Sequence, residues 1–246
     1  MAGTQKPTWF FPAHVYVCAI QDQGFFLDLK RNEYLSAPLC ELQSLSRSVD
    51  GWPRDFNAVD PQGKETSSQS AIDELARNHI LSAKPLRLNK LEAPPGPPAR
   101  GALRNYGSFE YSHIFFFHLF TFLKAAILAR YFLSVRSLYA MMRRIERRRL
   151  RESAARGSGD LATMRRLVEV FMRLQPLLPP TQTPCLVNSI TLLEFLATYG
   201  QFPRLVFGVQ SHPFCAHCWI QHGDVVLNSA LEQVRQFTPM NGRRQA

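Results

Sequence analysis

The sequence lacks several features that mark common functional classes. Its five cysteines are an odd number without regular spacing, which argues against the disulfide framework of a small secreted domain. No apolar stretch of signal-peptide length follows Met1, so we expect a reducing, cytoplasmic location. The chain also has no internal repeat and no glycine-rich phosphate loop of the G-x-x-x-x-G-K-S/T type, so no cofactor-binding motif is recognisable.

Acidic residues are outnumbered. Asp and Glu total 19 against 29 Lys and Arg, which gives a formal net charge of +10. The excess is concentrated in the segment 143–156, where seven arginines are offset only by Glu146 and Glu152. Such runs bind nucleic acid, anionic lipid or acidic partners in some proteins, but they more often form a solvated helix face. We interpret this run as such a face.

Hydrophobic residues make up 46% of the 246 positions, which is enough for one large domain or two small ones. Four prolines between Pro94 and Pro98 exclude a helix or a central strand there. We therefore predict an α+β protein with an N-terminal domain (1–85), a Pro-rich linker (86–105) and a C-terminal domain (106–246). The C-terminal domain divides into a helical segment, 106–176, and a core, 177–246.

The N-terminal domain shows strand and turn patterns followed by helical ones. His14–Ile20 and Phe25–Leu29 read as strands around the turn Gln21–Gly24. Helices are expected over 38–50 and over Ser70–Leu81, the second with Ser70 as its cap. This order predicts a winged-helix-like module.

The helical segment opens with an aromatic stretch, Ile114–Leu123, followed by Lys124 and Arg130. Because a membrane-spanning helix needs about twenty apolar residues, the stretch is too short, and we expect a buried helix, with an interfacial helix as the alternative. Further elements follow from capping and periodicity: a break at 157–160, an amphipathic helix Leu161–Leu174, a helix over 185–199 ending at Gly200, a strand Arg204–Val209, and a hairpin formed by 216–221 and 225–228.

Two residues of this core point to chemistry. Cys185 follows Pro184 at the start of a predicted helix, and His217 lies thirty-two residues later in a predicted strand. A helix N-terminus and an imidazolium both favour the thiolate, which is the nucleophilic form of cysteine. Taken singly, a cysteine in an apolar helix is more often a small buried hydrophobe, and a strand histidine is more often structural. The order of the surrounding elements favours a catalytic pair.

Four stretches around the pair carry a family resemblance: Cys185-Leu-Val-Asn-Ser, Leu205-Val-Phe-Gly-Val, Phe214-Cys-Ala-His-Cys-Trp-Ile-Gln-His-Gly-Asp-Val-Val-Leu-Asn and Phe237-Thr-Pro. Together they resemble the B proteins of lasso peptide biosynthesis over residues 184–239. The resemblance implies a transglutaminase-like, papain-like cysteine peptidase fold that removes the leader from a ribosomally made precursor. Cys185 would be the nucleophile and His217 the base and acid.

The third catalytic residue departs from the family pattern, which usually has Asp where this chain has Ser229. A three-residue hairpin turn, 222–224, would place Ser229 opposite His217, and a two-residue turn, 222–223, would place Asn228 there. We therefore keep Asn228 and Ser229 as alternative orienting residues, with Asp224, in the turn, as a weaker choice. Gln182 is a weak candidate for the oxyanion hole.

The stretch Gly24–Tyr34 resembles the leader-recognition domain of the same pathways. In that family the leader adds a strand to the small sheet, so main-chain hydrogen bonds supply affinity. The resemblance implies these leader-binding residues: Phe25, Phe26, Leu27, Asp28, Leu29 and Tyr34. It also implies two partners, the lasso precursor and an asparagine-synthetase-like, ring-closing protein that would handle ATP. Peripheral membrane contact stays open.

Two other hypotheses compete with the prediction of a peptidase. Cys215-Ala-His217-Cys218 has C-x-x-C spacing, and His212, His222 and Cys185 are available as further zinc ligands, but strand parity would place Cys215 and Cys218 on opposite faces. We therefore expect no metal. A winged-helix-like module with a basic helix could instead bind nucleic acid or peptide without catalysis. Because the basic run lies beyond the linker, we expect no nucleic-acid partner.

Overall fold

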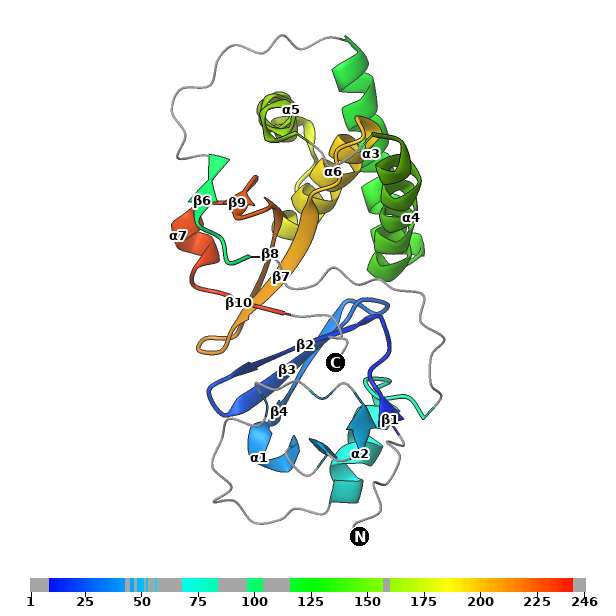
Figure 1. The fold of residues 1–246 in the computed structure, drawn as a ribbon, viewed down its shortest axis with the longest axis vertical. Coiled ribbons are helices and arrows are strands. Elements are labelled where there is room, and N and C mark those ends of the chain that lie inside the picture. The colour runs from blue at the N-terminus through cyan, green and yellow to red at the C-terminus, as the bar shows by residue number, and fades with distance from the viewer. Residues whose placement is uncertain are drawn as a thin grey trace. The chain divides into compact units, whose positions relative to one another are not determined.

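The computed structural model describes residues 9–42, 45–46, 48–50, 52, 56, 68–83, 97–103, 116–156 and 160–240. The chain forms two compact units, each described below by itself (Figure 1). The first comprises residues 1–95 with 211–213 and 238–246, and the second comprises 96–210 with 214–237.

The first unit is built on a three-stranded antiparallel meander of β2 (Val15–Ile20), β3 (Gln23–Asp28) and β4 (Glu33–Pro38). The central strand is β3, because it pairs with β2 on one side and β4 on the other. Gln21, in the turn between β2 and β3, has φ of 54°. The remaining elements are β1 (Trp9–Phe10), which pairs in parallel with β5 (Val49–Asp50), and the helices α1 (Leu39–Leu42) and α2 (Ser68–Arg77).

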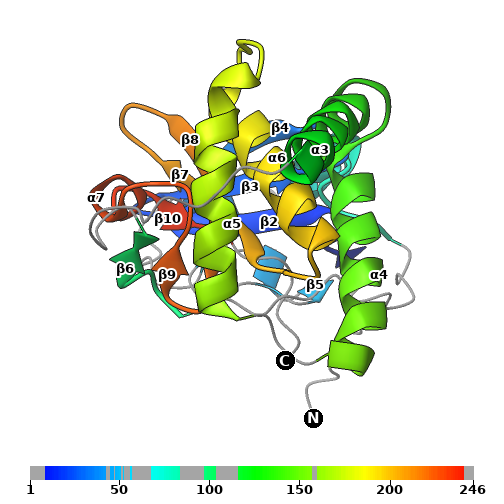
Figure 2. The same cartoon turned by 90° about the horizontal axis from the view of Figure 1, so that it is seen from above.

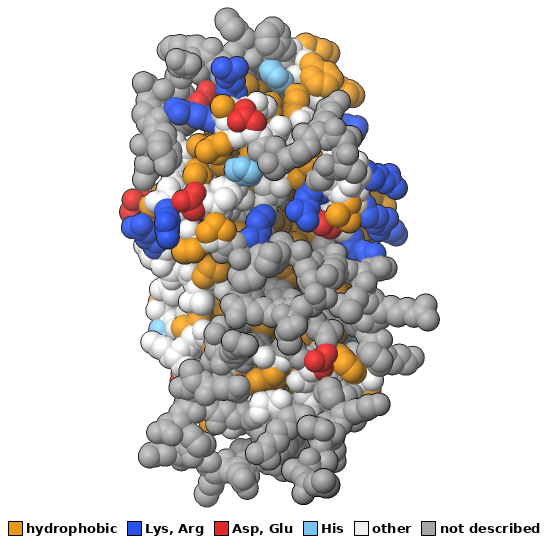
Figure 3. Space-filling view, in the orientation of Figure 1, with side chains coloured by type: hydrophobic (Ala, Val, Ile, Leu, Met, Phe, Trp, Pro, Cys, Tyr) orange, Lys and Arg blue, Asp and Glu red, His pale blue; other side chains and the backbone are white. Residues whose placement is uncertain are grey.

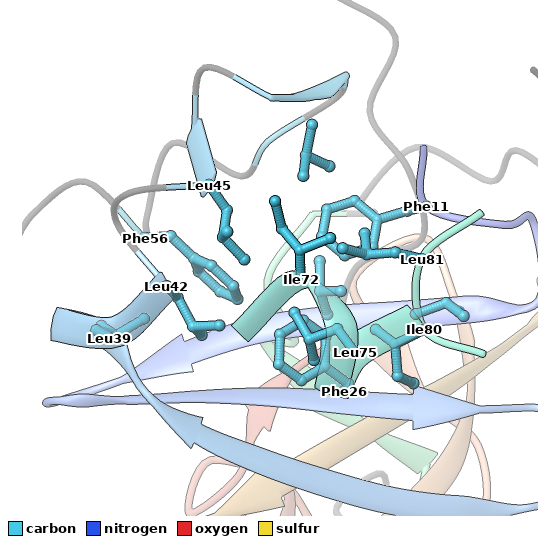
Figure 4. Close-up of a cluster of buried hydrophobic side chains, with 13 residues drawn as sticks. Phe11, Phe26, Leu39, Leu42, Leu45, Phe56, Ile72, Leu75, Ile80 and Leu81 are labelled. Carbon is cyan, nitrogen blue, oxygen red and sulfur yellow. The ribbon is translucent and has the colours of Figure 1, made fainter. Parts of the chain in front are cut away.

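One face of this meander carries the core shown in Figure 4. Phe26 of β3 is fully buried and meets the ring of Phe56 edge to face, with 5.9 Å between centroids. Ile72 and Leu75 of α2 belong to the same cluster. Gly24 is required by close approach, because a Cβ there would lie 2.6 Å from Leu42.

Two helix predictions for this unit were wrong in extent. The segment 38–50 contains only the four-residue α1, since Val49 and Asp50 pair with β1, and tertiary pairing overrides local propensity there. The second helix begins at Ser68, so Ser70 is not its cap. It ends at Arg77 because the chain reverses at His79, where φ is 59°.

In the described part of the second unit, four helices lie between β6 (Gly101–Ala102), the first strand of its sheet, and the remaining strands. The helices are α3 (Phe116–Val135), α4 (Leu138–Arg156), α5 (Leu161–Leu174) and α6 (Pro184–Thr198), with a short 3-10 turn η4 (Gln175–Leu177) after α5. The sheet contains β7 (Arg204–Gln210), β8 (Cys215–His222), β9 (Val225–Val226) and β6 (Gly101–Ala102), in that order. The helix α7 (Leu231–Val234) and β10 (Thr238–Pro239) complete the chain's elements.

Helix α6 is the centre of this unit. It contacts β8 as well as α3, α4 and α5 (Figure 2), and its residues 189–197 are buried without interruption, so it is covered on every side. Its end is a Schellman motif, in which Gly200 with φ of 72° donates to Ala197 O and Gln201 donates to Leu196 O. The predicted stop at Gly200 is therefore confirmed, as are the predicted limits of α5.

Part of the predicted linker belongs to the sheet of the second unit. Gly101 and Ala102 form β6, which pairs in parallel with β9. The side-chain amide of Gln221 donates to Pro97 O at 2.8 Å. Within the described residues 97–103, the chain is thus an integral edge of the second unit's sheet.

The arginine-rich helix α4 is not simply a solvated face. Arg144 and Arg148 both contact Oε1 of Glu194, a buried carboxylate of α6. Arg148 also donates to Ala197 O at 2.7 Å. A buried carboxylate requires such partners, and sequence periodicity gave no sign that Glu194 would be buried.

Helix α3 corrects the prediction for the aromatic stretch. It continues past Lys124 and Arg130 to Val135, so its 20 residues meet the length and hydropathy expected of a membrane-spanning helix. Only 22% of its most apolar stretch is buried. The buried-helix prediction therefore holds for one face, and the other face is exposed.

Candidate active site

Cys185 occupies the first turn of α6, directly after Pro184. Pro184 suits this position because its fixed φ matches the helix and it has no N–H to leave unpaired. The amide of Val187 donates to Thr183 O, which closes the first turn. The N–H groups of Cys185 and Leu186 precede it and have no carbonyl inside the helix to bond. The half-buried thiol therefore lies where unpaired donors and the positive end of the helix dipole meet.

His217 lies on β8, opposite Gly208 of β7. Its ring is flanked by those of Phe237 and Trp219, with centroids 5.2 and 6.1 Å away. Gly208 allows this arrangement, because a Cβ there would lie 2.8 Å from the Trp219 ring and 2.9 Å from Phe237. These two aromatic neighbours restrict the rotation of the imidazole.

Ser229 contacts the histidine. Its Oγ lies 3.1 Å from Nε2 of His217, and the residue is buried. The hairpin turn that brings it there is neither of the two expected. It consists of Gly223 and Asp224, because His222 pairs with Val225. Gly223 has φ of 57°, as the first position of a tight hairpin turn requires.

That register would place Ala230 opposite His217 if the ladder continued. The strand β9 ends at Val226, however, and although Leu227 N still donates to Ile220 O, residues 227–229 form a bend that leaves the ladder. This departure, rather than strand pairing, delivers Ser229 to the imidazole.

The other proposed orienting residues contact different groups. Asn228 Oδ1 accepts from Ile220 N at 2.8 Å, and its Nδ2 donates to Ser189 Oγ at 2.8 Å. Asn228 thus links β8 to α6 and does not orient the ring. Asp224 lies in the turn, where its carbonyl accepts from Arg100 and Gly101.

The electrostatics favour a thiolate at Cys185. The pKa of its thiol is lowered to about 4, first by a hydrogen bond from the Cys218 side chain and second by one from His217. Burial opposes this shift, and the charge of His217 and the backbone of Cys218 add to it. A nucleophile in this setting is ionised at neutral pH.

Cys218 was not anticipated as part of the site. It is fully buried, and its pKa is raised well above that of an ordinary thiol, chiefly by the hydrogen bond to Cys185. It therefore keeps its proton and acts as donor. Its carbonyl accepts from Ser189 Oγ at 3.2 Å, which fixes this part of β8 against α6. The sequence offered no signal for this role, because strand parity predicts that Cys218 faces away from His217.

The other predicted site residues lie elsewhere. Gln182 is exposed ahead of α6, and none of the described hydrogen bonds joins it to Cys185. Cys215 is exposed whereas Cys218 is buried, so the two cysteines cannot bind one ion. Among the described residues there is no group of three or more His, Cys, Asp or Glu side chains placed to hold a metal.

The proposed leader-binding residues are mostly core. Five of them are buried: Phe25, Phe26, Leu27, Asp28 and Leu29. Strand β3 pairs through its main chain with β2 on one edge and with β4 on the other, so an added strand finds no open edge on β3. Asp28 accepts from Lys30 N at 2.7 Å, which stabilises the turn after β3. Tyr34 differs, because it lies half-buried on β4 at the edge of the sheet.

Comparison with known proteins agrees with this geometry. Residues 128–242 match the family described as the transglutaminase-like superfamily. No curated protein and no solved structure matches the chain. Residues 128–242 are thus similar to a transglutaminase-like domain, and this similarity favours a cysteine-peptidase type of fold. That superfamily includes cysteine proteases and transglutaminases.

Proposed function

We propose that the protein is a cysteine peptidase that cleaves the leader from a lasso precursor peptide. The observation that carries the proposal is the thiolate of Cys185 at the start of α6, next to an imidazole whose far nitrogen contacts Ser229. The transglutaminase-like domain supports the class of reaction. The precursor as substrate rests on the resemblance of the four stretches within 184–239 to lasso B proteins.

The chemistry follows from the two nitrogens of His217. Because Nε2 contacts Ser229, Nδ1 is the nitrogen that faces the thiol. The Cys185 thiolate attacks the carbonyl of the leader–core bond, and Nδ1–H gives its proton to the departing amine of the core. A leader thioester remains on Cys185. Water that loses a proton to His217 then hydrolyses this thioester, which releases the leader carboxylate and regenerates the thiol.

The tetrahedral intermediates carry an oxyanion. The N–H groups at the start of α6, that of Cys185 among them, would supply the donors for it. Gln182 is not needed for this role.

The edge strand β4 is the surface on which the leader would add. Within the described residues, β3 is the strand with which β4 pairs, so β4 is an edge strand of this sheet. Tyr34 and Leu35 on this strand are half-buried and supply apolar contact. A leader strand bonded there would deliver its core to the peptidase, and ring closure with ATP would fall to the asparagine-synthetase-like partner.

The test is cleavage of a lasso precursor peptide, followed by mass spectrometry, with and without a ring-closing protein. Wild-type protein should release free leader acid and core amine, and Cys185→Ala should release neither. Cys215→Ala is the matched control, since Cys215 is an exposed thiol of β8. Cleavage by the Cys185→Ala variant would refute the mechanism. Transfer of the leader to an amine instead of water would show a transglutaminase.

A further inference from the structure

The exposed face of α3 has a regular composition. Phe116, Phe120, Leu123, Ile127 and Tyr131 are spaced by three or four residues, so they form one stripe along the helix. All five are exposed, with Phe116 84% and Ile127 69% accessible. A stripe of this size on a soluble protein marks an interaction surface.

The charges beside the stripe have one sign. Helical geometry places Lys124 along one border and Arg130 along the other, and both are exposed. The sequence from residue 111 to residue 145 contains no Asp or Glu. On the face shown in Figure 3, hydrophobic side chains lie over the upper end of α3, and Lys and Arg side chains gather over α4.

The opposite face of α3 is fixed inside the domain. Thr121 Oγ1 lies 2.9 Å from the Tyr199 hydroxyl, and the ring of Phe122 meets that of Phe171 at 5.4 Å between centroids. Ala125 and Ala129 are buried on the same side. A helix crossing a bilayer would have to leave these contacts, whereas a helix lying in the interface keeps them.

We propose that this face docks the protein on a bilayer that contains anionic lipids, with α3 in the plane of the interface. The apolar stripe would enter the boundary between headgroups and acyl chains, while Lys124 and Arg130 extend to the headgroup phosphates. A second copy of the chain fits less well, because two such faces would oppose cations without any acidic residue between them. An acidic protein partner would pair with the two cations, but it would not offer the acyl layer into which the five apolar side chains fit.

The experiment is flotation of the full-length protein with vesicles, either of phosphatidylcholine alone or of phosphatidylcholine and phosphatidylglycerol in equal parts. We expect binding to the anionic vesicles, little binding to the neutral ones, and weaker binding as salt rises. The double variant Phe120→Gln/Ile127→Gln should weaken binding by about tenfold or more. Leu177→Gln is the control, since Leu177 is similarly exposed but lies on η4.

Three results would overturn the proposal: no flotation of the wild type, equal flotation of the double variant, or a wild-type dimer that the double variant converts to a monomer in light scattering. If the double variant melts at a lower temperature, Lys124→Glu/Arg130→Glu replaces it. That variant changes only exposed side chains. It should lose binding to anionic vesicles, and binding equal to that of the wild type would equally overturn the proposal.

Discussion

The strands β3 and β8 are both central and both rich in aromatic residues, yet they serve different purposes. Every residue from Gly24 to Asp28 of β3 is buried, so the strand is used entirely for the core. On β8 burial begins only at Cys218, and His217 next to it is half-exposed. The candidate reactive groups therefore lie where β8 leaves the core, at the step from the accessible His217 to the buried Cys218.

The largest effect should come from the accessible side of β8. Replacing His217 by Ala removes the proton donor to the leaving amine. It also removes a hydrogen bond that is the second-largest cause of the lowered pKa of Cys185. We expect kcat for leader cleavage to fall by about 10⁴-fold or more. The rate is measured by mass spectrometry of the released core. His222→Ala, at the far end of the same strand, should cleave at a rate close to that of the wild type, and a similar loss there would void the comparison.

The next effect should come from β3. Phe26→Ala leaves a cavity beside Phe56 and should lower the free energy of unfolding by about 3–5 kcal/mol. Denaturant titration followed by circular dichroism measures this loss.

Tyr34→Ala on the edge strand should cost much less stability but weaken leader binding, measured by titration with labelled leader. Leader binding by Tyr34→Ala equal to that of the wild type would contradict the assignment of β4 as the binding edge.

A smaller effect should separate Ser229 from Asn228. Ser229→Ala frees the imidazole and should lower kcat about tenfold to a hundredfold with an unchanged folded structure. Asn228→Ala breaks the bonds to Ile220 and Ser189, so we expect about 1–3 kcal/mol of lost stability instead. Steady-state kinetics and thermal melting on the same preparations check this. If both variants lowered only the melting temperature and left kcat unchanged, Ser229 would have no role in the site.

The smallest effect should come from Cys218. Cys218→Ala removes the largest contribution to the lowered pKa of Cys185, so that pKa should rise toward its ordinary value. The rise appears as an upward shift of the pH midpoint for alkylation of Cys185. An unchanged midpoint would show that His217 and the helix end alone stabilise the thiolate.

Local signals predicted part of the fold well. Asp160 caps α5 by accepting from Ala162 and Thr163, and the glycine and aspartate before the helix indicated this start. Gly200 ends α6 for an equally local reason. Both ends depend only on residues within one helical turn.

The positions that could not be predicted locally depend on neighbours distant in sequence. The run Phe25-Phe-Leu-Asp-Leu is apolar without alternation, which is typical of a strand buried on both faces, and the family resemblance outweighed that signal. The position of Ser229 depends on where β9 leaves the ladder, and the role of Cys218 depends on α6 packing against β8. Neither can be obtained from spacing alone. The catalytic roles of Cys185 and His217 stay predictions.

The most direct test of the account is the rate of alkylation of Cys185 by iodoacetamide as a function of pH, quantified by mass spectrometry of its peptide. Cys40 and Cys215, the exposed thiols, are replaced by Ser to simplify the reaction. Because the thiolate is the reactive form and the pKa is about 4, the rate should stay level from pH 9 down to about 5 and fall only below that. A rate that instead rises through pH 8 to 9, as for an ordinary thiol, would contradict the claim that α6, Cys218 and His217 build a nucleophile.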